Sequence, residues 1–216
     1  MEATRIIAIR HGETAWNVDT RIQGQLDIGL NERGRWQAMR AAQALAGEVL
    51  ASIYSSDLER ARDTAQAIAR VSGHQVATHE GLRERGFGRF EGRTFAEIES
   101  HWPEDALRWR KRDPLFAPPD GGEHLVAFRE RVVSAASDLA ARHLGEQIVL
   151  VAHGGVMDIL YRAATGQDLS APRTWELANA AINRLLWTPG GFTLVGWGET
   201  QHLDHPAEGP LDESTA

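Results

Sequence analysis

Residues 4–12 read TRIIAIRHG, a short apolar, β-branched run that leads directly into His11. Residues 147–155 read QIVLVAHGG, and the same arrangement places His153 after a second run. Such runs are typical of strands that are buried on both faces of a parallel sheet. Ligands of open α/β sheets bind beyond the carboxyl ends of the strands, so the two histidines are expected at the ligand-binding edge.

The rest of the chain alternates strands with amphipathic helices. Further strands are expected at residues 51–54, 75–78, 180–188 and 191–197, and helices at 31–47, 57–71, 123–144 and directly after residue 155. A turn at Pro189-Gly190 joins the last two strands into a hairpin. This order predicts an α/β fold, a three-layer α/β/α sandwich whose central sheet is mainly parallel and is made mixed by the hairpin.

A single domain is expected over residues 1–198, followed by a flexible tail at 199–216 that lacks apolar periodicity. Residues 80–122 form an irregular insertion that is rich in Gly, Arg, Trp and Pro, with short helices at 95–102 and 105–110. A segment of this kind is usually functional, as a lid or a binding loop. Its aromatic side chains either form a wall of the substrate site or pack beneath the insertion: Phe87, Phe90, Phe95, Trp102, Trp109 and Phe116.

The composition excludes several classes of protein. The 216 residues are most simply one domain, and the lack of cysteine excludes a disulfide scaffold, a thiol nucleophile and an iron–sulfur cluster. The 30 acidic residues outnumber the 23 Lys and Arg, which argues against a nucleic-acid partner. No apolar run reaches the ~18–20 residues of a membrane span, and the N-terminus lacks the pattern of a signal peptide. A cytoplasmic protein with no membrane partner is therefore expected.

The string RHGET at residues 10–14 carries the chemistry. A neutral imidazole is a competent nucleophile toward phosphorus, and a neighbouring guanidinium supplies planar donors for phosphoryl oxygens. The longer stretch RHGETAWN, residues 10–17, resembles the signature of the histidine phosphatase superfamily, in its phosphoglycerate-mutase-like branch.

Four more segments resemble motifs of that family, in the family's order. Gln23-Gly24, with Asp27 and Leu30, is similar to its substrate-contacting segment, and SSDLERARDTA at 55–65 to the helix start that bears a second phosphate arginine. LRERGFGRFEG at 82–92 is similar to the segment that supplies the proton donor. GGE at 121–123 resembles the opening of a long helix, although His124 stands where the family often has Ser, and VAHGG at 151–155 completes the set. The resemblance covers residues 4–197.

The resemblance implies a role for each residue of a phosphoryl-transfer site. His11 attacks phosphorus and becomes a phosphohistidine, and Glu84 protonates the leaving oxygen and then deprotonates the water that releases phosphate. Arg10, Arg60 and His153 hold the equatorial oxygens. The further substrate-binding residues expected are Asn17, Gln23, Gly24, Arg62 and Gly154, and a cationic pocket is expected around Arg10, Arg21, Arg60 and Arg62.

The mutases of this family share the catalytic core, so a 2,3-bisphosphoglycerate-dependent phosphoglycerate mutase is the alternative to a phosphatase. The family's cofactor-dependent mutases carry a longer segment between the Glu84 region and the final histidine. The compact segment here resembles the phosphatase members, so a phosphomonoesterase is favoured, whose partners are a small phosphorylated metabolite and inorganic phosphate. A non-catalytic phosphate-binding module would be expected to lose the nucleophile or the acid, whereas both His11 and Glu84 are present. The physiological substrate and the choice between a monomer and a homodimer stay open.

Two rival sites are weaker. His11, His153 and Glu84 resemble a two-histidine, one-carboxylate metal site, but their spacing is not typical of metal ligands, and Arg10 would place a positive charge beside the metal. Residues 86–92 resemble a glycine-rich dinucleotide loop only superficially, because the third glycine is one residue late and no predicted strand leads into it. Neither a metal nor another cofactor is expected.

Overall fold

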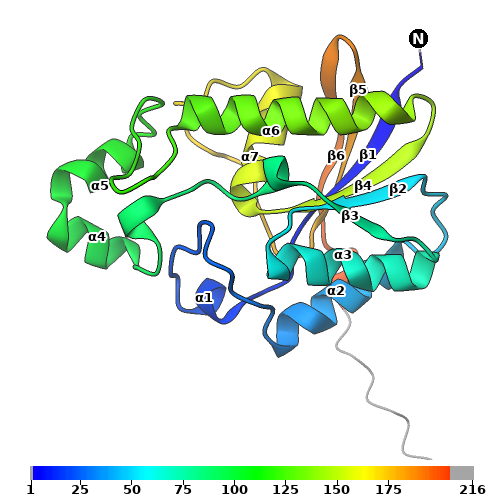
Figure 1. Ribbon diagram of the computed structural model, residues 1–216, viewed down its shortest axis with the longest axis horizontal. Helices are drawn as coiled ribbons and strands as arrows, with labels where there is room; N and C mark the ends of the chain where they lie inside the picture. The colour runs from blue at the N-terminus through cyan, green and yellow to red at the C-terminus, as the bar shows by residue number, and fades with distance from the viewer. Residues whose placement is uncertain (1, 205–216) are drawn as a thin grey trace, which may run out of the picture.

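The strands of the computed structural model, which describes residues 2–204, form a twisted central sheet (Figure 1). They are β1 (Thr4–Arg10), β2 (Ser52–Ser55), β3 (Val76–Thr78), β4 (Gln147–Ala152), β5 (Ile182–Thr188) and β6 (Gly191–Glu199). Their order across the sheet is β3-β2-β4-β1-β5-β6. β1 to β4 run parallel, β5 runs antiparallel to β1, and β6 runs antiparallel to β5. The prediction of a mainly parallel sheet that a hairpin makes mixed is confirmed.

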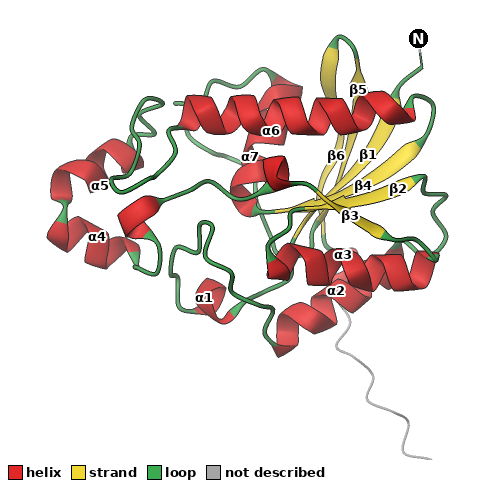
Figure 2. Cartoon of the chain, in the orientation of Figure 1, coloured by secondary structure: helices red, strands yellow, loops and turns green. Residues whose placement is uncertain are grey.

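Helices cover both faces of this sheet (Figure 2). They are α2 (Glu32–Ala44) and α3 (Glu59–Ser72) on one face, and α6 (Leu125–Ala140) and α7 (Gly154–Thr165) on the other. Successive side chains of a strand point to opposite faces. In β1, Ile6 and Ala8 therefore join the cluster under α6 and α7, while Ile7 and Ile9 join the cluster under α2 and α3. This two-sided burial produces the predicted three-layer sandwich.

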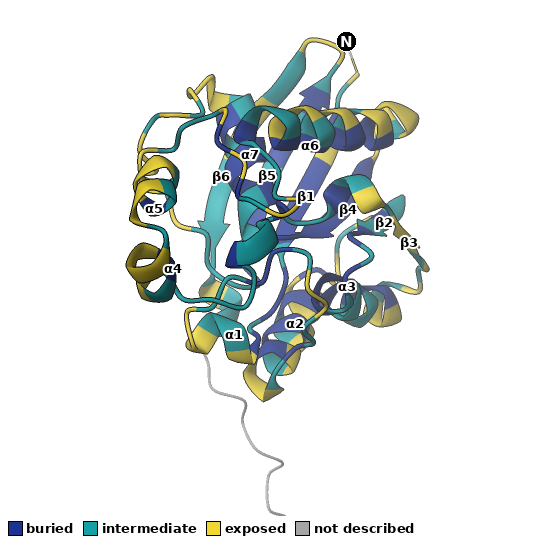
Figure 3. Cartoon of the chain, turned by 60° about the vertical axis from the view of Figure 1, so that its left-hand side comes forward, coloured by how far each residue is buried: buried dark blue, intermediate teal, exposed yellow. Residues whose placement is uncertain are grey.

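The centre of the sheet is the most deeply buried part of the chain (Figure 3). Every residue of β4 is buried, which explains why its sequence is apolar without alternation. β1 lies beside it in parallel register, with Arg10 opposite Ala152. The residues that follow the two strands therefore emerge side by side at one edge of the sheet.

The insertion at residues 80–122 has an apolar cluster of its own, away from the sheet (Figure 1). It contains η1 (Glu80–Leu82), η2 (Gly88–Phe90), α4 (Phe95–His101) and α5 (Pro103–Arg110). Phe90 and Phe116 are buried in this cluster, and the other four aromatic rings of the insertion pack against them: Phe87, Phe95, Trp102 and Trp109. Of the two alternatives for these rings, packing beneath the insertion is the one that the structure shows.

Several helix boundaries differ from the predicted ones. The helix expected at 31–47 ends at Ala44, with Leu45 rather than Gly47 at its C-cap. The helix expected at 57–71 begins at Glu59, whose N–H donates to Asp27 Oδ1 at 2.6 Å. The long helix begins after His124, whose Nδ1 accepts the N–H of Ala127. A short helix, α1 (Ala15–Val18), was not expected. None of the helices in residues 2–204 is long and apolar enough to cross a membrane.

The predicted start of a flexible tail at residue 199 is wrong. β6 continues to Glu199, and η4 (Gln201–Leu203) follows it and lies against α2. Arg40 Nε on α2 donates to the carbonyl of His202 at 2.8 Å. Polar contacts of this kind leave no apolar periodicity in the sequence, which is why the prediction missed them. The remainder of the predicted tail, residues 205–216, lies outside the described residues.

Candidate active site

Two histidines meet at the carboxyl edge of the sheet. His11 follows β1 and His153 follows β4, and the His11 N–H donates to the carbonyl of Ala152 at 2.9 Å. Their ring centroids are 5.3 Å apart, with an angle of 60° between the ring planes. Both side chains are buried. The strand pairing alone thus brings together two residues that are 142 positions apart in the chain (153 − 11).

The His11 ring is held as a neutral imidazole with one free nitrogen. Its Nδ1 lies 2.7 Å from the carbonyl of Gly12, and because a carbonyl only accepts, Nδ1 carries the proton. Burial, together with the charges of Arg60 and Arg10, lowers the pKa of His11 well below its ordinary value of 6.5. Nε2 therefore keeps its lone pair at neutral pH, as a nucleophile requires.

Two buried arginines flank the histidines. Arg60, on the first turn of α3, donates to the carbonyls of Gly24 and Leu26, each at 2.8 Å. Burial lowers its pKa to about 10, while the nearby charges of Glu84 and Asp27 oppose that shift. Arg10 donates to the carbonyl of Leu177, and a Cβ atom added at Gly154 would lie 3.5 Å from Arg10 Nε.

Four buried nitrogen atoms of this group have no hydrogen-bond partner among the described residues. They are Arg10 Nε, Arg60 Nε and both ring nitrogens of His153. Buried polar groups are nearly always hydrogen-bonded, and an unpaired one is costly. Two guanidinium groups with donors still to be satisfied form a site for an anion, and phosphoryl oxygens match the planar geometry of arginine.

Glu84 supplies the acidic group of the site. Its Oε1 accepts the N–H of Arg85 at 2.8 Å, and its Oε2 accepts the N–H of Gly155 at 2.9 Å. Gly155 follows His153 by two positions, so this bond brings the carboxylate to the histidine edge of the sheet. The negative charge of Glu84 opposes the lowering of the pKa of both Arg10 and Arg60. The nucleophile, the cations and the carboxylic acid that were predicted for phosphoryl transfer thus lie together.

The loop after β1 holds two more of the predicted residues. Thr14 caps α1, and its N–H and hydroxyl both donate to Asn17 Oδ1, at 3.0 and 3.1 Å. The same hydroxyl lies 3.0 Å from Gln23 Oε1. Asn17 and Gln23 therefore build the loop that carries His11, with the Gly12 N–H anchored on Thr64 of α3.

Two of the arginines expected in the cationic pocket are not among the charges that lower the pKa of His11. Arg21 donates to the carbonyl of Gly92 at 2.8 Å and pairs with Glu97, so it joins the loop after α1 to the insertion. Arg62, one of the predicted substrate-binding residues, makes no ion pair or hydrogen bond through its side chain within residues 2–204, and its charge acts on Asp57. The cations that the fold brings to His11 are Arg10 and Arg60.

The segment before β5 contributes residues that the sequence did not single out. Asn179 Nδ2 donates to the carbonyl of His11 at 2.9 Å, and the carbonyl of Leu177 holds Arg10. Because β5 runs antiparallel to β1, its beginning lies at the end of β1. The predicted hairpin indicated that a strand begins near residue 180, but the sequence did not show that this strand, β5, pairs with β1.

In the part of the chain that the structure describes, no three His, Asp or Glu side chains are grouped so that they could hold a metal ion. The alternative of a site made by His11, His153 and Glu84 also meets a physical objection. The two guanidinium groups beside the histidines repel a metal cation and attract an anion.

The family model of the histidine phosphatase superfamily (branch 1) matches residues 6–200. The chain belongs to the histidine phosphatase superfamily. The two strand-end histidines, the two buried arginines and the carboxylate described above all lie within the matched residues of this histidine phosphatase.

Known histidine phosphatases resemble the chain along most of its length. Phosphoglycerate mutase-like protein 4 of Arabidopsis thaliana is 37% identical, over 94% of this chain and 89% of its own. The solved structure of a mycobacterial glucosyl-3-phosphoglycerate phosphatase matches with a TM-score of 0.82 at 35% identity, over 92% of this chain and 100% of that one. A phosphoserine phosphatase of Entamoeba histolytica, solved with 3-phosphoglyceric acid, matches with a TM-score of 0.82 at 31% identity, over 93% and 99%.

Proposed function

We propose that the protein is a metal-independent phosphomonoesterase that hydrolyses small phosphorylated metabolites through a phosphohistidine on His11. One observation carries this proposal. A buried imidazole with a free Nε2 lies beside four unpartnered nitrogen atoms of Arg10, Arg60 and His153. The phosphatase names of solved relatives that align over more than nine tenths of the chain support it.

In the first step, His11 Nε2 attacks phosphorus and the bond from phosphorus to the ester oxygen breaks. Glu84, in its protonated form, gives its proton to the leaving oxygen, so that an alcohol departs. Arg10, Arg60 and His153 donate to the three equatorial oxygens, whose charge is spread in the transition state. The Gly154 backbone is assigned to the same cradle, because a Cβ atom added there would lie 3.5 Å from Arg10 Nε.

In the second step, water attacks the phosphorus of the phosphohistidine. Glu84, now a carboxylate, accepts a proton from that water, and the nitrogen–phosphorus bond breaks with its electron pair returning to His11. Inorganic phosphate leaves, and His11 and Glu84 are restored. The protein's own side chains thus supply the nucleophile, the acid and the charge neutralisation.

The test is hydrolysis of p-nitrophenyl phosphate and of a panel of phosphorylated metabolites, by protein dialysed against a chelator. Undiminished release of phosphate supports the proposal. Loss of activity that a divalent ion restores would contradict the metal-free mechanism, and saturable phosphate binding with no turnover would identify a non-catalytic binding module.

A phosphoglycerate mutase is the second candidate, because similar proteins also carry that name. A mutase passes the phosphoryl group from His11 to a second hydroxyl rather than to water. The same protein is therefore assayed for interconversion of 3- and 2-phosphoglycerate with 2,3-bisphosphoglycerate present. Isomerisation as fast as ester hydrolysis, and dependent on the bisphosphate, would assign the mutase instead.

A further inference from the structure

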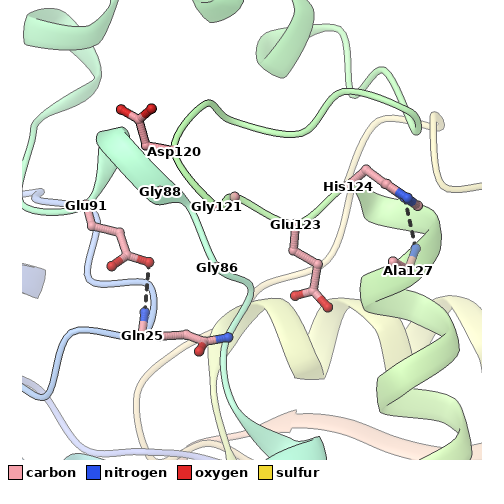
Figure 4. Close-up of a pocket in the computed structure, with 10 residues that line it drawn as sticks. Gln25, Gly86, Gly88, Glu91, Asp120, Gly121, Glu123, His124 and Ala127 are labelled. Atoms are coloured by element: carbon pink, nitrogen blue, oxygen red, sulfur yellow. Dashed lines mark hydrogen bonds between the residues drawn. The ribbon is translucent and has the colours of Figure 1, made fainter.

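Glu91 joins two segments of the site that are far apart in the chain. Its Oε1 accepts the N–H of Gln25 and the N–H of Phe87, each at 3.0 Å. Glu91 and Gln25 lie on one side of a pocket of about 590 Å³, with the bond between them drawn in Figure 4. A single carboxylate oxygen thus holds the loop after α1 to the segment that follows Glu84.

One of these segments binds the side chain of Arg60, and the other contains Glu84. The carbonyls of Gly24 and Leu26 accept hydrogen bonds from the two terminal nitrogens of Arg60, so the loop after α1 holds the guanidinium in place. A second bond runs in parallel with the Glu91 contacts, since Gln25 Nε2 donates to the Glu84 carbonyl at 3.1 Å.

The contact between Gly24 and Glu91 leaves no room for a side chain at position 24. Gly24 has a φ of +52°, and a Cβ atom there would lie 2.1 Å from Glu91 Oε1. Only glycine both adopts this backbone conformation readily and leaves room for the carboxylate. Gly24, which the sequence predicts as a substrate-binding residue, therefore has a second reason to be glycine.

We propose that Glu91 is a positioning residue, which sets the distance between the guanidinium of Arg60 and the carboxyl group of Glu84. The inference rests on the proposed function, in which Arg60 holds the phosphoryl group while Glu84 protonates the leaving oxygen. Both contacts must be made to one substrate at the same time. A misplacement of ~1 Å in such an arrangement costs about 100-fold in rate.

The test compares two esters that differ in their need for an acid. p-Nitrophenolate leaves with little protonation, whereas the alkoxide of glycerol 2-phosphate requires a proton. Glu91→Ala should lower kcat/KM for glycerol 2-phosphate about 100-fold and for p-nitrophenyl phosphate no more than about tenfold. Glu91→Gln keeps an oxygen that accepts both N–H groups, so it should restore the wild-type ratio between the two esters.

A double-mutant cycle with Gln25→Ala tests whether the two bonds act as one bridge. The double variant should lose little more kcat/KM for glycerol 2-phosphate than the more impaired single variant. The reason is that the effects of substitutions within one network are not additive. Glu130→Ala, at an exposed position on α6, is the matched control and should leave the ratio of kcat/KM between the two esters unchanged.

Other results separate this inference from the proposed function. If Glu91→Ala lowers kcat/KM for both esters in equal proportion, or if Glu91→Gln behaves like Glu91→Ala, Glu91 does not act by positioning Glu84. If the effects of Glu91→Ala and Gln25→Ala multiply, the two bonds do not form one bridge. If the wild-type protein hydrolyses neither ester, the proposed function fails, and the inference fails with it.

Discussion

Glu84 is fastened to the helix that follows the second histidine by the N–H of Gly155, which donates to Glu84 Oε2 at 2.9 Å. A Cβ atom at position 155 would lie 2.2 Å from Glu84 Oε1, far inside van der Waals contact. This bond links Glu84 to the start of α7, where His153 is the N-cap and Gly155 lies in the first turn.

This contact makes Gly155→Ala a test of where Glu84 must lie. The new methyl group has to displace the carboxylate, so kcat for alkyl phosphates should fall about 100-fold. The change is measured by steady-state kinetics, with folding checked by circular dichroism. Gly47→Ala is the matched control, because a Cβ atom there meets nothing within 4 Å. Wild-type turnover by Gly155→Ala would show that the acid does not depend on this contact.

The stability of the protein should fall as the pH drops below 6.5, because the pKa values of His11 and His153 lie well below that ordinary value. Between pH 6.5 and the folded-state pKa, His11 and His153 bind protons in the unfolded chain but stay neutral in the folded protein. Each histidine then lowers the free energy of unfolding by up to about 1.4 kcal/mol per pH unit, and the loss ends at the folded-state pKa.

The measurement is urea unfolding between pH 7.5 and 5 in phosphate-free buffer. His11→Asn removes one of the two buried rings, so its stability should depend less steeply on pH than that of the wild type. His101→Asn, at an exposed position, should keep the wild-type slope. Equal slopes for His11→Asn and the wild type would contradict a depressed pKa at His11.

Asp158 should be a major contributor to stability. It pairs with Arg162 at 3.0 Å and with Arg112 of the insertion at 2.8 Å, and the side chain of Arg162 is 0% exposed. Asp158→Ala leaves a buried guanidinium without its carboxylate, which costs about 3–5 kcal/mol of unfolding free energy. Denaturant unfolding measures the loss.

An exposed ion pair provides the comparison for Asp158. Glu99 pairs with Arg110 at 2.7 Å, but both side chains are at least half exposed, so Glu99→Ala should cost less than about 1 kcal/mol. Similar losses for Asp158→Ala and Glu99→Ala would show that the buried network adds no more than a surface pair.

The sheet and its histidine-bearing edge were predictable, because the composition of β1 and β4 alone indicates buried strands. The apolar runs at residues 4–10 and 147–152 are buried on both faces, and each leads into a histidine and a glycine. The motifs predict roles for His11, Arg60 and Glu84, since the order of the motifs along the chain is a property of the sequence.

Contacts between distant segments were not predictable. Asp27 accepts the N–H of Glu59 and so fixes where α3 begins, 32 residues further along the chain. Asn179 reaches the His11 carbonyl only because β5 pairs with β1. Arg60 and Arg62 lie two positions apart on α3, and only the folded protein shows that Arg60 is buried while Arg62 is partly exposed.

The most direct test of the proposed function is whether His11 carries the phosphoryl group during turnover. Wild-type protein mixed with excess substrate, and quenched within the first turnovers under alkaline conditions that preserve phosphohistidine, is digested and examined by mass spectrometry. We expect one phosphoryl group on the peptide that contains His11, and we expect neither this adduct nor ester hydrolysis in His11→Asn. Phosphate on another side chain, or turnover by His11→Asn, would contradict it.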